Sequence, residues 1–162
     1  MTQVKRYKIG EFYDECRSLG LTPPWYIMDM ETDAFLKGIE YIDVPLSVFD
    51  EMKREKAKHD KWETEYQSIS FLRLQGMDDE KSGNIEKAIS SYRQCIEMGE
   101  QSTFNMFHAY AHAYDRLIIL LHKTKQYDLE AQYIKSLLKH DSLSTAIINK
   151  YSNRLNKLNL KK

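Results

Sequence analysis

The chain has 162 residues, and its 24 basic and 24 acidic side chains leave a formal net charge of zero. That balance excludes a whole-protein attraction to nucleic acid or to an anionic membrane, so neither is an expected partner. Only 6 Gly and 3 Pro are present, too few for an all-β protein with frequent turns, while 42% hydrophobic residues can supply a core. The composition therefore predicts an all-α protein.

The first 60 residues have an irregular pattern that is mostly helical. A short helix is predicted over 12–20, two prolines then interrupt the chain, and a second helix is predicted over 25–36. The alternating residues of 40–45 predict a short extended segment that Pro45 closes. Large apolar side chains are frequent here, so we expect this segment to pack on the helices that follow. A homodimer formed through the same residues is the alternative.

Between residues 50 and 65 the sequence mixes acidic and basic residues. Asp50 and Arg54 lie four positions apart, as do Lys61 and Glu65. This spacing is typical of the exposed face of a helix. A patch for nucleic acid is the weaker interpretation, because the acidic side chains neutralise the lysines.

From Trp62 onward, apolar residues recur every three or four positions, which is the period of an amphipathic helix. The pattern predicts five helices, and Gly99 is expected to end the second of them. The last helix has a polar face of Asn, Lys, Arg and Ser, as expected of a terminal capping helix. The expected ranges are 64–82, 84–98, 103–125, 127–140 and 144–158.

Small and aromatic residues follow a defined spacing through the first two of these helices: Gly76, Gly83, Ala88, Tyr92 and Cys95. This spacing resembles that of a tetratricopeptide repeat, in which small residues let two helices approach closely and an aromatic ring fills the space beside them. The resemblance implies a short α-solenoid of antiparallel helix pairs within 64–162. Its two units would cover about 69–100 and 103–141, and 144–158 would cap them.

The same resemblance implies a concave face lined by the first helix of each unit, and hence a non-catalytic module that binds a protein or peptide segment. The groove would be basic although the whole chain is neutral, so an acidic segment is the expected ligand. The carboxylate clamp of some family members is not expected, because Met77 and Arg116 stand where its asparagines would be. The implied groove residues are Arg73, Met77, Glu80, Lys81, His112, Arg116, Ile119, His122 and Lys123.

The alternative function is a metal-binding protein or metal-dependent enzyme that uses the third of the five helices. His108 and His112 have the i,i+4 spacing that can hold a metal ion, and Asp115 lies on the same face. The pair lacks the glutamate that acts as the base in the His-Glu-x-x-His motif. Histidines in helical repeats are commonly structural, so we expect no metal, no cofactor and no catalytic residue.

Cys16 and Cys95 are the only cysteines, and neither belongs to a Cys-x-x-Cys pair. They are expected to be reduced thiols, and Cys95 is expected on a buried helix face. No apolar stretch approaches the roughly 20 residues that a membrane span needs, and no secretory signal is visible at the N-terminus. These observations predict a cytoplasmic protein.

Overall fold

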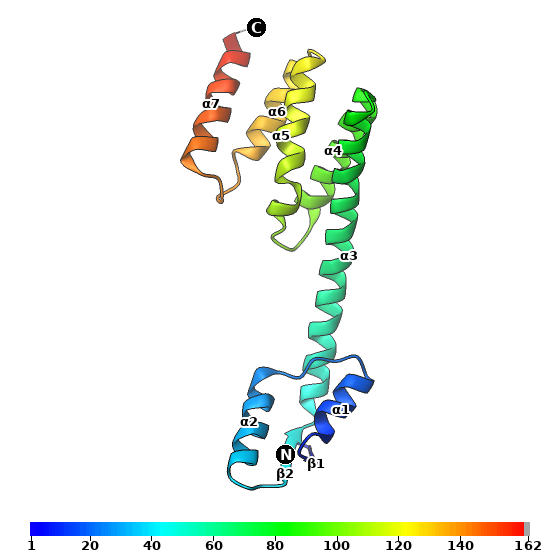
Figure 1. The fold of residues 1–162 in the computed structure, drawn as a ribbon. Coiled ribbons are helices and arrows are strands. Elements are labelled where there is room, and N and C mark those ends of the chain that lie inside the picture. Colours follow the sequence, from blue (N-terminus) through cyan, green and yellow to red (C-terminus); the bar gives the residue numbers. More distant parts are fainter. Residues whose placement is uncertain (161–162) are drawn as a thin grey trace. The chain divides into compact units, whose positions relative to one another are not determined.

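The computed structural model describes residues 1–160 and is mostly helical (Figure 1). Its contacts divide the chain into two units, Met1–Glu63 and Thr64–Lys162. Helix α3 (Ser47–Lys81) contributes residues to both units. None of the helices described is long and apolar enough to cross a membrane.

Unit 1 combines helices with a small sheet. Helices α1 (Glu11–Ser18) and α2 (Trp25–Leu36) lie between strands β1 (Val4–Lys8) and β2 (Tyr41–Pro45) in the sequence. The strands are antiparallel, with Val4 opposite Pro45 and Lys8 opposite Tyr41. The extended segment predicted over 40–45 is thus confirmed as β2, whereas β1 was not predicted. The predicted all-α class therefore omitted one small two-stranded sheet.

The apolar residues of unit 1 form a core of their own. Both strands, both short helices and the first turns of α3 contribute to it, so these residues are folded together. The core residues are Tyr7, Phe12, Cys16, Leu21, Ile27, Ala34, Ile42, Val44, Val48 and Met52. The packing of residues 1–60 on the repeats stays a prediction.

Helix α3 begins at Ser47, well before the predicted start at Thr64. No proline or glycine occurs between Ser47 and Gln75 to interrupt it. The charged stretch is the exposed helix face that its spacing predicts, and Lys56 pairs with Asp60 at 2.9 Å, one turn apart. This early start was not predicted, because apolar residues do not recur every three or four positions in the charged stretch.

Unit 2 contains the second part of α3 and four further helices. Consecutive helices pack on one another, α4 with α5, α5 with α6, and α6 with α7 (Figure 1). The five predicted helices are therefore confirmed. The first is part of the longer α3, and the other four differ from their predicted ranges by a few residues at their ends. The four helices are α4 (Ile85–Gln101), α5 (Phe107–Lys123), α6 (Tyr127–Leu137) and α7 (Thr145–Leu160).

Two buried glycines mark close contacts between helices of unit 2. A Cβ atom on Gly76 would lie 2.6 Å from Cε1 of Tyr92, so α3 and α4 approach closely there, as the spacing of small and aromatic residues predicts. Gly99 does not end α4, which continues to Gln101, and that prediction was wrong. A Cβ atom on Gly99 would overlap the ring of Tyr110. Gly99 therefore provides space for a ring from α5.

Candidate functional site

A groove of about 430 Å³ opens on unit 2 between α3 and α5. Tyr92 of α4 also contributes to its wall. Five of the predicted groove residues meet here, although they come from two helices that α4 separates in the sequence. The lining residues are Met77, Glu80, Lys81, Tyr92, His112 and Arg116.

Arg116 is already paired with a carboxylate inside the groove. Its Nε donates a hydrogen bond to Oε2 of Glu80 at 3.2 Å, and its Nη2 donates a second one to Oε1. The hydroxyl of Tyr92 also donates to Glu80, at 3.1 Å. The Arg116 guanidinium is the main cause of the lowered pKa of Glu80, which stays ionised. Arg116 and Glu80 therefore form a neutral pair, and the expectation that Arg116 adds to a basic groove was wrong.

Three other cations remain on or beside the groove: Arg73, Lys81 and Lys123. No ion pair joins any of them to the rest of the described chain. The positive charge of Lys123 contributes to the lowered pKa of Glu80, which places Lys123 near the same end of the groove. The local excess of positive charge thus rests on these three side chains.

Arg73 lies one turn before Met77 on α3, beyond the groove lining itself. In the part of the chain that the structure describes, its Nε atom is buried and has no hydrogen-bond partner. The same holds for Oγ of Ser70, one turn earlier on the helix. Buried donors are normally satisfied by protein, water or a ligand. Ser70 was not among the predicted site residues, and its i,i+3 spacing to Arg73 is the signal that could have found it.

Two contacts bracket this part of the groove. At one end the ring of Tyr66 lies 6.1 Å from that of His108, and at the other end Glu80 binds Arg116. Arg73 on α3 and His112 on α5 fall between these contacts in sequence. Ile119 is half-buried and shares the helix face of His112 by its spacing.

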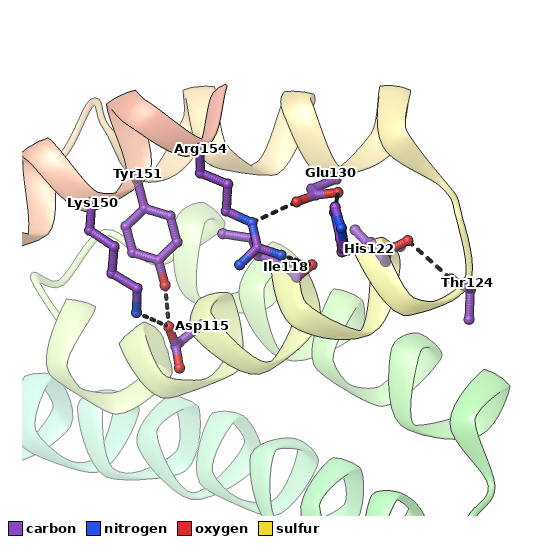
Figure 2. A network of polar contacts seen from close by, with 9 residues as sticks. Asp115, Ile118, His122, Thr124, Glu130, Lys150, Tyr151 and Arg154 are labelled. Carbon is purple, nitrogen blue, oxygen red and sulfur yellow. Dashed lines mark hydrogen bonds and ion pairs between the residues drawn. The ribbon is translucent and has the colours of Figure 1, made fainter. Parts of the chain in front are cut away.

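The structure turns His122 away from the groove and toward α6, so its prediction as a groove residue was wrong. Its Nδ1 lies 2.9 Å from Oε2 of Glu130, which is fully buried (Figure 2). The other oxygen of Glu130 accepts a hydrogen bond from Nε of Arg154 at 2.7 Å. His122 is therefore part of a polar network that joins α5, α6 and α7.

Asp115 also belongs to this network (Figure 2). It accepts hydrogen bonds from the Tyr151 hydroxyl and, at 3.2 Å, from Nζ of Lys150. Burial acts to raise the pKa of Asp115, but the hydrogen bonds from Tyr151 and Lys150 outweigh it and lower that pKa. Within residues 1–160, no group of three or more His, Cys, Asp and Glu side chains is placed to hold a metal ion. The Asp115 carboxylate instead connects α5 to α7.

A second depression, of about 600 Å³, lies between α4 and α6. It was not predicted, because the resemblance implied a groove only on the face lined by the first helix of each unit. Its rim carries the carboxylates of Glu86, Glu97 and Glu100, and Arg93 binds the hydroxyl oxygen of Tyr133 across it at 3.2 Å. Its charge is thus opposite to that of the groove between α3 and α5.

Both cysteines are free and buried. Burial raises the pKa of Cys95 to about 11, and it also raises the pKa of Cys16. Because the thiolate is the reactive form, we expect both thiols to resist 5,5′-dithiobis(2-nitrobenzoate) at pH 8 in the folded chain and to react rapidly in denaturant. Absorbance at 412 nm measures the thionitrobenzoate that each reacting thiol releases. Rapid release of thionitrobenzoate by the native chain would contradict the burial of Cys16 and Cys95.

The fold and the groove together define a mostly helical protein with an open, ligand-sized depression between two helices. No family model, no curated protein and no solved structure matched the chain.

Proposed function

We propose that unit 2 is a tetratricopeptide-like interaction module that binds an acidic segment of another protein in the groove between α3 and α5, without catalysis. The observation that carries this proposal is the convergence of Met77, Lys81 and His112 on one open groove. The close approach of α3 and α4 at Gly76, and the complete burial of Ala88, agree with the helix crossings of that repeat family. The consecutive packing of α4 to α7 supports a short helical stack.

The charges around the groove support an acidic ligand. Arg116 is neutralised by Glu80, so it does not provide a free charge. Lys81 and Lys123 are exposed, and they can form charge-assisted hydrogen bonds with carboxylates. Arg73 lies one turn before Met77 on α3, and its guanidinium adds a third positive charge beside the groove. We therefore assign ligand binding to Arg73, Lys81 and Lys123, with Arg116 holding the groove together.

The test uses a fluorescein-labelled peptide rich in Glu and a matched peptide with Gln at the same positions, each titrated against the full chain. Fluorescence anisotropy should show tighter binding of the Glu peptide, and added salt should weaken it. The variant Lys81→Glu/Lys123→Glu should lower its affinity by about tenfold or more, because two attractive contacts become repulsive.

The matched control is Lys87→Glu/Lys135→Glu, which makes the same change of net charge at exposed positions of α4 and α6. This control should bind the Glu peptide almost as the parent chain does. Equal affinity for the Glu and Gln peptides, or equal losses in the two double variants, would contradict the proposal. Circular dichroism establishes that each variant is folded.

A further inference from the structure

Helix α2 of unit 1 has two apolar faces, and only one of them is buried. Ile27 and Ala34 face the core of unit 1 together with Glu31, whose Oε1 accepts a hydrogen bond from the Gly10 amide at 2.5 Å. The opposite side carries four large apolar side chains. Their exposed fractions are 73% for Trp25, 46% for Met28, 69% for Phe35 and 77% for Leu36.

These four side chains lie together and are not scattered around the helix. At about 100° per residue they occupy an arc of about 100° on α2, and Thr32 is the only polar residue within it. Single exposed apolar residues are ordinary on protein surfaces, but two aromatic and two aliphatic side chains in one stripe mark an interaction surface. We call this stripe the α2 face.

The surroundings of the α2 face are acidic. Residues 24–46 contain five acidic residues and one basic residue, Lys37. Glu31 is buried on the core side and Asp43 is bound to Arg6 at 2.9 Å, so neither adds to the charge beside the stripe. Lys37 is bound to Asp33 at 2.8 Å. Within the described residues, Asp29 at the edge of the stripe has no ion-pair partner.

Charge decides between the candidate occupants of this face. A second copy of α2 would bring the same acidic edge against Asp29, and like charges oppose each other at such an interface. An anionic membrane is disfavoured for the same reason. A helix whose apolar stripe is flanked by Lys and Arg would cover the apolar residues and neutralise Asp29.

We propose that the α2 face binds an amphipathic helix of another protein that carries basic residues beside its apolar stripe. Trp25 and Phe35, near the two ends of α2, are the main anchors, since aromatic side chains contribute most to interfaces of this kind. This surface belongs to unit 1, and the proposal is independent of the groove in unit 2.

The probe is a synthetic helical peptide with Leu at positions i, i+3, i+4 and i+7 and Lys elsewhere, and its matched control has Glu in place of Lys. The full chain carries Trp62→Phe, so that Trp25 is its only tryptophan. The Lys peptide should shift the Trp25 emission to shorter wavelength and bind at least about tenfold more tightly than the Glu peptide.

The variant Phe35→Glu/Leu36→Glu should lower the affinity for the Lys peptide by about tenfold or more. Added carboxylates would strengthen a purely electrostatic attraction, so a loss identifies the apolar contact. The matched control is Phe71→Glu/Leu74→Glu on α3, where the side chains are 66% and 51% exposed. It should bind as the parent chain does, and circular dichroism checks that both variants are folded.

Three outcomes would overturn the proposal. The first is equal binding of the Lys and Glu peptides, and the second is unchanged affinity in Phe35→Glu/Leu36→Glu. The third is a dimer at micromolar concentration in sedimentation that this variant dissociates, which would assign the α2 face to a second copy of the chain.

Discussion

Replacing Glu130 with leucine is expected to destabilise unit 2 by about 2–4 kcal/mol. The Glu130 carboxylate is fully buried and accepts hydrogen bonds from Arg154 of α7 and His122 of α5 (Figure 2). Leucine would leave the Arg154 guanidinium without its carboxylate partner, at a site where the side chain is only 26% exposed and the Ile118 carbonyl oxygen, 3.4 Å from Nη2, is its remaining acceptor.

The measurement is urea unfolding of the full chain followed by circular dichroism, together with hydrogen exchange of the amides in α6 and α7. Exchange should accelerate first in these two helices, because the network joins them to α5. The double variant Glu130→Leu/Arg154→Leu should be less destabilised than Glu130→Leu alone, since it removes the unpaired charge. Glu86→Leu, at an exposed position of α4, is the matched control and should change stability little. A double variant that loses more than the single one would contradict this account.

Replacing Gly99 with alanine is expected to destabilise the chain by about 1–3 kcal/mol. Helix propensity alone predicts the opposite, because alanine is favoured over glycine inside a helix by about 1 kcal/mol. The reason is steric: the new Cβ atom would overlap the ring of Tyr110, which is only 4% exposed and cannot move freely. Urea unfolding measures the change in the free energy of unfolding. A decrease shows that the contact with Tyr110 dominates, and an increase shows that helix propensity dominates.

The control is the same substitution in a Tyr110→Leu background, where the ring is absent. There the destabilisation by Gly99→Ala should shrink or change to a gain, and the difference between the two backgrounds measures the contact. A gain in stability from Gly99→Ala in the parent chain would show that α4 and α5 do not approach closely at this glycine.

Local sequence determined most of the helices. The apolar period of three and four residues predicted α4 to α7, and it placed Ala88, Tyr92 and Cys95 on the buried face of α4, where the structure has them. The alternation of 40–45 predicted β2 in the same way. These features depend on neighbours a few residues away, so the sequence contains the information directly.

Strand β1 depended on pairing that the local sequence does not contain. Within Val4–Lys8 only Tyr7 is buried, and three of its five residues are basic, so no alternation marks it as a strand. Its ladder exists because β2, far along the chain, supplies the partner backbone groups.

The candidate site depended on tertiary structure to a greater extent. The family resemblance implied that Glu80, Lys81 and Arg116 share a groove, but it did not show that Glu80, 36 residues before Arg116, neutralises that arginine. Likewise, glycine is common at helix ends, so the sequence predicted that Gly99 ends α4. In the structure Gly99 lies inside α4, where it gives space to the ring of Tyr110 from the next helix. Helical periodicity specifies which face of a helix is buried, whereas the partner that a charge or a glycine meets is decided by how the helices pack.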